Sequence, residues 1–378
     1  MGTIWDKETL LNNTNWDSRM KTIDQTEWLQ NLLNSGSGTI VIPDGDYVVA
    51  KTLRIPDNTK IICSPRTTLR LADGANCPLI GNVAQGRIFS RNITIEGGIW
   101  DGNNLGQQRD KYAARDKYPS SMDGLGGQLM VFTYVKNLTL RDLTLKDPES
   151  FGVQLTAVEE FTVEDILFDY NKLRGNMDGI HVNGFARNGL IRNLKGETHD
   201  DMVALNSDEG DFICECCDIE NITIENIYGG SDGWTGVRLL SRQAALRNIA
   251  IRNLHGGYKY NGVSFTHWGP NPETADYGRF DNILLDGIFA YSCRKSGKGH
   301  GGIIWFQPYL RHIGTVVCRN IFRADPPENL NTVQTVEIGD GVVIDTLNIH
   351  GLHQQVTDGK PAVLVAESAK VKNLLIGP

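Results

Sequence analysis

A short pattern of alternating apolar and polar positions recurs along most of this 378-residue chain. Each copy starts with Asn, once replaced by Glu, and continues with apolar residues at alternate positions, a small polar residue or Gly, and a last apolar residue. Alternation over so few positions is typical of short β-strands, and copies at irregular intervals indicate turns of a solenoid with variable loops. The copies begin at Asn92, Asn137, Glu160, Asn188, Asn221, Asn248 and Asn282.

A second short strand follows in each unit, with the form Gly, apolar, any, apolar. Its alternation predicts two buried columns inside the solenoid. The pattern therefore predicts an all-β fold, a right-handed parallel β-helix, with residues 1–378 forming a single domain. A β-sandwich would instead need hairpin turns of the Asn-Gly or Asp-Gly type between its strands. The first column should hold Val153, Ile180, Val203, Val237, Val263 and Ile303, and the second Leu155, Val182, Leu205, Leu239, Phe265 and Trp305.

Two further elements follow from the pattern. The repeated Asn predicts a stacked ladder at a corner, because Asn tolerates tight backbone geometry and satisfies exposed amides. Residues 24–33 predict a short amphipathic helix, with Asp24 and Glu27 in capping-box positions. This helix would cap the open end of the solenoid, whose edge strand would otherwise invite aggregation.

Charge and composition narrow the range of partners. A net charge of −8 argues against a nucleic-acid partner, and no run of 18 apolar residues is present to span a membrane. No basic start followed by an apolar run is visible at the N-terminus, so we expect a cytoplasmic protein, or a secreted one whose leader has been removed. The sequence leaves the oligomeric state open.

Seven cysteines are an odd number, so a complete set of internal disulfides is impossible. Cys214, Cys216 and Cys217 form a C-x-C-C cluster, but no His lies close by and the spacing matches no common zinc pattern. We interpret these residues as structural thiols in a reducing compartment.

Candidate chemistry lies in the column just before the second strands, which holds Phe151, Asp178, Asp201, Thr235, Asn261 and Gly301. Because neighbouring turns lie about 4.7–4.9 Å apart, Asp178 should stack on Asp201, with Asp200 beside them. Three carboxylates this close cannot all ionise easily, and pKa values pushed apart suit acid–base cleavage of a glycosidic bond. Asp residues at turns can also be mere scaffold. The polar neighbours that favour catalysis are Asn176, Asn183, His199 and Asn206, all predicted to point outward.

Two segments resemble the motifs of a known family. The segment N-M-D-G-I from Asn176 resembles the N-T-D-G motif of the polygalacturonase family, glycoside hydrolase family 28, and H-D-D from His199 is similar to its Q/G-D-D motif. Weaker similarity extends outward over about residues 20 to 310, at G-S-G-T-I-V-I-P-D-G-D-Y from Gly36, W-D-G-N from Trp100 and F-G-V-Q-L from Phe151.

The resemblance implies a pectin-lyase-like β-helix that hydrolyses a plant-type or pectin-related saccharide with inversion. It implies that Asp200 is the general acid and that Asp178 and Asp201 hold and deprotonate the attacking water. It also implies that no metal or organic cofactor is needed.

Two motifs of that family are not matched. Thr235 stands at the His of its G-H-G motif, and Ser264 and Thr266 stand at the Arg and Lys of its R-I-K motif. Since the basic pair grips a substrate carboxylate in the family, we expect a substrate other than plain homogalacturonan, with Arg238 as the nearby residue able to bind an anion. The candidate substrate-binding residues are Asn176, His181, His199, Arg238, His267 and Trp268.

Aromatic residues at loops and strand ends beside the same face are candidate groove walls, because aromatic faces stack on sugar rings. For Trp268 the alternative is packing beneath the loop at residues 270–278. The candidate walls are Tyr258, Tyr260, His267, Trp268 and His300.

Two other functions fit the same fold. A carbohydrate-binding β-helix without turnover would keep its affinity after Asp178→Asn. A polysaccharide lyase would need a base near neutral pH, usually Arg or Lys and often beside bound calcium, and would release an unsaturated, ultraviolet-absorbing product.

Overall fold

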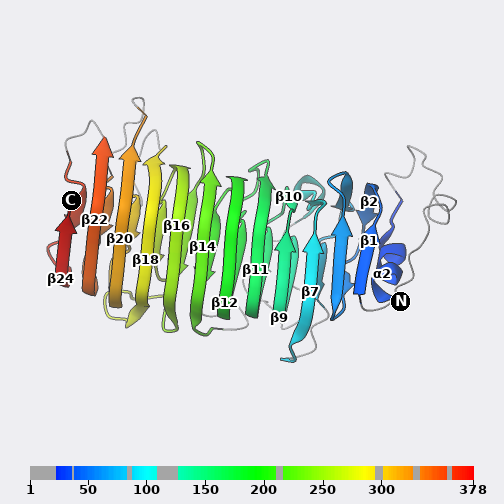
Figure 1. The fold of residues 1–378 in the computed structure, drawn as a ribbon, viewed down its shortest axis with the longest axis horizontal. Helices are drawn as coiled ribbons and strands as arrows, with labels where there is room; N and C mark the ends of the chain where they lie inside the picture. The colour runs from blue at the N-terminus through cyan, green and yellow to red at the C-terminus, as the bar shows by residue number, and fades with distance from the viewer. Residues whose placement is uncertain are drawn as a thin grey trace.

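The computed structural model describes residues 23–35, 38–82, 87–108, 127–209, 216–293, 301–326, 333–355 and 360–378. The described strands join one continuous sheet of 24 strands, and each of their pairings is parallel. The sheet winds as a right-handed parallel β-helix, as the sequence predicted. Successive turns lie side by side along the length of the molecule (Figure 1).

Within the described ranges, the helices are α2 (Thr26–Asn34) and the 3-10 turn η2 (Asn104–Gly106). The strands are β1 (Gly38–Ile42), β2 (Gly45–Val49), β3 (Leu53–Ile55), β4 (Thr59–Cys63), β5 (Thr67–Leu71), β6 (Ile80–Asn82), β7 (Ser90–Glu96), β8 (Ile99–Asp101), β9 (Met130–Arg141), β10 (Thr144–Lys146), β11 (Val153–Asp169), β12 (Ile180–Glu197), β13 (Asp201–Asn206), β14 (Ile219–Gly229), β15 (Thr235–Leu240), β16 (Ala245–Tyr258), β17 (Val263–Thr266), β18 (Tyr277–Ser292), β19 (Ile304–Phe306), β20 (Leu310–Ala324), β21 (Val336–Ile338), β22 (Val343–Gln355), β23 (Val363–Val365) and β24 (Lys370–Gly377).

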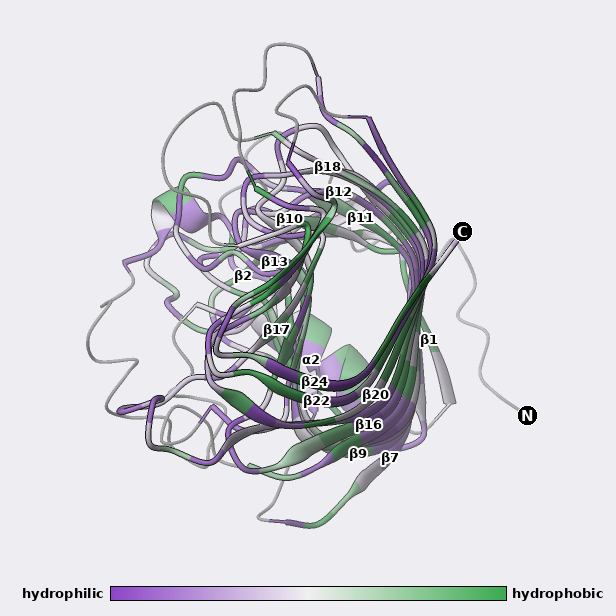
Figure 2. Cartoon of the chain, turned by 90° about the vertical axis from the view of Figure 1, so that its left-hand side faces the viewer, coloured by the Kyte–Doolittle hydropathy of each residue, from purple (hydrophilic) through white to green (hydrophobic). Residues whose placement is uncertain are grey.

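The interior of the coil is filled by one continuous cluster of buried apolar side chains. Viewed along the axis, the turns superimpose, so that the strands form walls around this common interior (Figure 2). Alternation within each short strand turns every second residue inward, which is why the apolar positions of the repeat stack from turn to turn. In the first predicted column, five in-register residues are fully buried: Val153, Ile180, Val203, Val237 and Val263.

The prediction fails at the last member of each column. Val263 pairs with Ile304 instead of Ile303, and the second column continues into Phe306 instead of Trp305. The run Gly302–Phe306 offers apolar residues in both alternation phases, so the pattern alone could not fix its register, and a slip of one residue reverses every side chain. Trp305 therefore lies on the outer side of its strand and is only partly buried.

The predicted Asn ladder is present at a corner of the coil. Side-chain amides donate from one turn to the next, as from Asn248 to Asn221 at 2.8 Å and from Asn282 to Asn248 at 2.7 Å. These residues have φ of 54–58°, in the left-handed region that Asn tolerates better than most residues. A second ladder one corner further includes Asn226 and Asn253, joined at 3.1 Å.

Helix α2 lies across the N-terminal end of the coil (Figure 1). It buries Leu29 and Leu33 against the first turn, which confirms the predicted cap. The predicted capping box is wrong, because the helix begins at Thr26 and its N-cap residue, Gln25, makes no side-chain cap. Asp24 instead accepts a hydrogen bond from the Thr26 amide at 2.9 Å. Among the described residues, no helix is long and apolar enough to cross a membrane.

Candidate active site

One wall of the coil, here called the site sheet, carries the candidate residues. It contains the second strands of the repeat and runs the length of the molecule. Its outward side chains alternate with the buried columns. The strand register that packs the core therefore also fixes the positions of the outward residues. The site sheet comprises β3, β6, the first residues of β9, β11 and β12, and then β13, β15, β17, β19, β21 and β23.

Asp178 and Asp201 stack directly in neighbouring turns. The Gly179 amide donates to the Asp201 carbonyl at 2.9 Å, and the Gly152 amide donates in the same way to Asp178. Gly179 has no room for a side chain, because a Cβ there would lie 2.4 Å from the Met202 carbonyl oxygen. The glycine after Asp178 therefore allows the close approach of backbones that sets the spacing of the two carboxylates.

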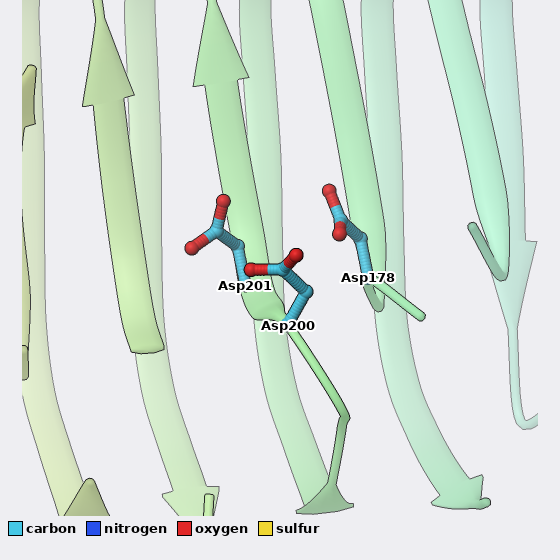
Figure 3. A group of neighbouring side chains, drawn as sticks. All are labelled: Asp178, Asp200 and Asp201. Atoms are coloured by element: carbon cyan, nitrogen blue, oxygen red, sulfur yellow. The ribbon is translucent and has the colours of Figure 1, made fainter. Parts of the chain in front are cut away.

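Asp200 completes the cluster from the turn that precedes β13. One carboxylate oxygen from each of Asp178, Asp200 and Asp201 lies within 4.8 Å of the others. Figure 3 shows Asp200 beside the start of β13 and Asp178 at the start of the neighbouring turn, with the side chains on the same side of the sheet. The structure thus brings together the three residues that the sequence singled out, with Asp178 and Asp201 buried and Asp200 partly exposed.

Burial and mutual repulsion separate the proton affinities of two of these groups. Burial, together with the charges of Asp201 and Asp178, raises the pKa of Asp200 to about 9. Burial also raises the pKa of Asp201, but Arg238 and a hydrogen bond from Thr235 oppose the rise, and the value reaches about 6. Between these values Asp200 holds its proton and Asp201 is ionised, so one cluster contains both an acid and a base.

His181 contacts one carboxylate of the cluster. Its Nδ1 is 2.6 Å from Asp178 Oδ2, and its Nε2 is 3.3 Å from Glu209 Oε2. The ring is buried and stacks on Phe151 at a centroid distance of 3.9 Å. Both ring nitrogens therefore face protein carboxylates, which leaves neither directed at a substrate.

Arg238 approaches the cluster from the next turn. Its Nη1 lies 3.5 Å from Asp201 Oδ2, and its Nε donates to Thr266 Oγ1 at 3.1 Å. The strand pairing places Arg238 beside Ser264 and Thr235 beside Asp201. One of the two residues at the positions of the family's basic pair thus holds the guanidinium by accepting a hydrogen bond.

The remaining predicted residues surround the cluster at different depths. Asn176 is exposed in the left-handed region, two residues before Asp178. His199 bonds the Arg174 carbonyl through Nδ1 and meets the Trp234 ring edge-to-face at 4.7 Å. Trp234 in turn lies 4.9 Å from the ring of Tyr260, so a short aromatic row flanks the turn that carries Asp200.

His267 and Trp268 lie toward the C-terminal side of the site sheet. His267 is buried, and its Nε2 lies 3.2 Å from the Pro308 carbonyl oxygen. Trp268 is 50% exposed. Cys216 and Cys217 are exposed. The candidate wall His300, and Cys214 of the C-x-C-C cluster, lie outside the described residues.

The three clustered oxygens are also the kind of ligands that a hard cation prefers. Two cationic side chains already approach them, however, because His181 bonds Asp178 and Arg238 faces Asp201. A divalent ion would have to sit beside both charges and share their carboxylates. The donor set fits proton transfer better than it fits a metal ion.

Sequence reasoning missed Glu209, which approaches His181 from the loop after β13. Asn183 and Asn206 were singled out as outward polar residues, and both donate to Glu209, at 3.1 and 2.7 Å. Both Asn side chains are fully buried. Both side chains are therefore paired with Glu209 and do not face solvent.

Comparison with known proteins identifies the family. The model of glycosyl hydrolases family 28 matches residues 39–291, which include every predicted member of the carboxylate cluster. The chain belongs to this family. An exopolygalacturonase of Oenothera organensis is 25% identical over 271 residues, which span 70% of this chain and 70% of that protein.

Solved structures of similar fold include a family 28 exopolygalacturonase of Yersinia enterocolitica, with a TM-score of 0.55, 15% identity, and coverage of 94% of this chain and 75% of that one. The Streptococcus pneumoniae surface adhesin PfbA matches with a TM-score of 0.53 and 14% identity, over 94% of this chain and 96% of that one. At such low identity these likenesses show the fold alone, which an exopolygalacturonase and a surface adhesin share.

Proposed function

We propose that this family 28 protein hydrolyses a glycosidic bond in a pectin-related oligosaccharide or polysaccharide, with Asp178, Asp200 and Asp201 as its catalytic residues. The observation that supports this proposal most strongly is the cluster itself. It combines a carboxyl group protonated up to about pH 9 with one ionised above about pH 6, within 4.8 Å of each other. A binding module has no need for such a separation.

In the proposed reaction Asp200 gives its proton to the leaving glycosidic oxygen as the bond from that oxygen to the anomeric carbon breaks. A water molecule attacks the anomeric carbon from the opposite side and gives its proton to Asp178 or Asp201. Two oxygens within 4.8 Å of each other can both accept hydrogen bonds from one water, since each such bond is about 2.7–2.8 Å long. The stacked pair therefore suits the positioning of the nucleophile.

The stereochemical outcome is the sharpest test of this role. Inverting enzymes usually separate their acid and base by about 6.5–9.5 Å, whereas a separation of about 5–5.5 Å is typical of a carboxylate nucleophile and retention. The oxygens here are closer than the usual inverting range. Because the resemblance to family 28 implies inversion, and two of the carboxylates can hold one water between them, we nevertheless expect proton NMR of a running reaction to show the inverted anomer first. Initial accumulation of the retained anomer would instead assign Asp178 or Asp201 as a nucleophile.

The substrate we propose is a neutral or differently substituted sugar in a pectin-related chain, not plain homogalacturonan. Ser264 and Thr266 carry no charge, and Thr266 already accepts a bond from Arg238. A partly desolvated carboxylate without a cationic partner costs several kcal/mol to bind, and each 1.36 kcal/mol is tenfold in rate.

Both the proposed catalytic residues and the proposed substrate can be tested on one panel. It contains polygalacturonate, pectin-related oligosaccharides and aryl glycosides, with products identified by mass. We expect Asp200→Asn to lower kcat by about 10²–10⁴-fold, the usual contribution of a general acid. Asp169→Asn is the matched control, since Asp169 is exposed and pairs with Lys146. Equal loss in the two variants would refute the catalytic site. Polygalacturonate cleaved faster than the rest of the panel would refute the proposed substrate.

A further inference from the structure

A line of charged side chains, buried at His181 and Asp178 and largely buried at Glu209, runs from Glu209 through His181 to Asp178 of the carboxylate cluster. The two links are 3.3 Å and 2.6 Å long, and His181 is 2% exposed. None of the catalytic steps proposed above uses Glu209 or His181. Two ionisable groups so close to the reacting carboxylates, one buried and one largely buried, call for a physical explanation, because burying charge is costly unless it is paired.

Glu209 is held as an anion by its surroundings. Burial alone would raise its pKa, but the charge and hydrogen bond of His181, with further help from Arg238 and Asn183, lower it below the ordinary value. Asn206 donates to its Oε1 at 2.7 Å and Asn183 to its Oε2 at 3.1 Å. Glu209 thus has a donor on each oxygen and little freedom to turn.

His181 is held as a cation in the same way. Burial alone would lower its pKa, but Glu209 and Asp178 raise it to about 10. A neutral imidazole has one N–H and could donate to only one of the two carboxylates, whereas the imidazolium donates to both. The stack on Phe151, with planes 7° apart, fixes the ring plane between its two partners.

We propose that Glu209 is a positioning residue for the proposed reaction, acting through His181 on Asp178. By keeping His181 protonated, Glu209 fixes Asp178 Oδ2 with a charged hydrogen bond and leaves the other oxygen to orient the attacking water. The remaining charged groups that face His181 are Asp200 and Asp201, whose pKa values its charge lowers, while Arg238 faces Asp201 from the other side.

This role has a consequence for the whole cluster. Without Glu209, His181 loses the larger of the two attractions that keep it charged in a buried site. A neutral His181 would leave Arg238 as the single cation beside three carboxylates among the described residues of the cluster. Asp178 Oδ2 would then lose its charged hydrogen bond, and the pKa values of Asp200 and Asp201, which the charge of His181 lowers, would rise, so the loss of activity should be largest at low pH.

The first test needs no turnover. In protein labelled with ¹⁵N-histidine, the chain has eight His signals, and the one missing in His181→Gln identifies His181. In the wild type we expect that signal to remain that of an imidazolium up to about pH 9. In Glu209→Gln we expect its titration midpoint to be at least two pH units lower. The same titration in both proteins would overturn the proposed link.

The second test measures kcat and KM between pH 5 and 9 on the substrate of the panel that the wild type cleaves fastest. We expect Glu209→Gln to lower kcat about tenfold at pH 6 and less at pH 8, with KM within twofold. Glu164→Gln is the matched control, because Glu164 also pairs with a cation, Arg192, but lies on a different wall of the coil. It should change neither parameter.

The outcomes separate this inference from the proposed function. A loss of kcat equal at every pH, a rise in KM alone, or no change in Glu209→Gln would overturn the positioning role while Asp200→Asn still tests the hydrolase. A wild type that cleaves nothing in the panel would refute the hydrolase and the positioning role together, even if the His181 titration showed the expected shift. Melting temperatures within a few degrees of wild type are required for each variant.

Discussion

Removal of the Arg238 charge should move the acidic limb of the pH–rate profile. Asp201, one of the two carboxylates proposed to accept the proton of water, has a pKa of about 6 because Arg238 and Thr235 partly offset its burial. The proposed acid Asp200 loses its proton near pH 9. Wild-type activity should therefore form a plateau between about pH 6 and pH 9, falling below it as Asp201 is protonated and above it as Asp200 ionises.

The size of the shift follows from the geometry. An opposite charge within about 4–6 Å lowers a carboxyl pKa by roughly 1–3. Arg238 Nη1 lies 3.5 Å from Asp201 Oδ2, but its side chain is 26% exposed, so screening by solvent favours the low end of that range. Arg238→Gln should raise the pKa of Asp201 by about one. At pH 6 the ionised fraction then falls from about one half to about one tenth, a roughly fivefold loss, and at pH 8 the loss is about a tenth.

The required measurement is kcat/KM at pH 6 and pH 8 for the wild type and Arg238→Gln. Each protein is assayed on a neutral and on an acidic member of the panel. Glutamine keeps an amide near Thr266 and removes the charge, so the comparison isolates electrostatics. We expect the fivefold loss at pH 6 on both substrates. Equal losses at the two pH values, confined to the acidic substrate, would show that Arg238 grips a substrate anion and would refute the reasoning.

Three further predictions concern the scaffold and the cluster. Val203→Asp places an unpaired charge between Ile180 and Val237 and should abolish the folded state, whereas Val203→Ala should cost roughly 2–3 kcal/mol; a soluble, cooperatively melting Val203→Asp protein would contradict the register. Gly179→Ala drives a methyl group to 2.4 Å from the Met202 carbonyl oxygen, so activity should fall at least tenfold with a lower melting temperature, and a variant of wild-type activity would show that the spacing of Asp178 is not set there. Dialysis against EDTA should leave kcat unchanged, because His181 and Arg238 already occupy the carboxylates; restoration of lost activity by Ca²⁺ would favour a metal-assisted reaction.

The core could be predicted from sequence wherever a single alternation phase is consistent with burial. Val237 has Gly236 and Arg238 on the opposite phase, and three of the other four members of its column likewise lie between Gly and a polar residue, so the column was placed correctly across five turns. At Ile303 both phases are apolar, and the register was wrong by one residue. The difference is energetic: the first segment has one register that buries its apolar side chains, while the second has two of similar burial.

The same argument applies to the start of α2. Asp24 and Glu27 have the spacing of a capping box, but spacing does not fix where the first helical turn begins. Tertiary contacts shifted it: Gln25 bonds the Val48 backbone through both its amide and its side chain, at 2.8 and 2.7 Å. With φ of −106° and ψ of 13°, Gln25 is held outside the helical region, so the helix begins one residue later.

The carboxylate cluster was within reach of the sequence because two of its members occupy one column of a repeat, and Glu209 was not because its loop has no repeat. A partial inference was nevertheless available. His181 faces outward three residues after Asp178. A buried imidazole in contact with one carboxylate needs a second partner for its other nitrogen. The loop after β13 has two adjacent acidic residues near its start, Asp208 and Glu209, and the sequence does not distinguish them. Asp208 is committed to the backbone amide of Gln243 at 3.0 Å, which leaves Glu209, with its longer side chain, to reach across to β12. Backbone geometry decides between these neighbours, and that information enters only with the folded loop.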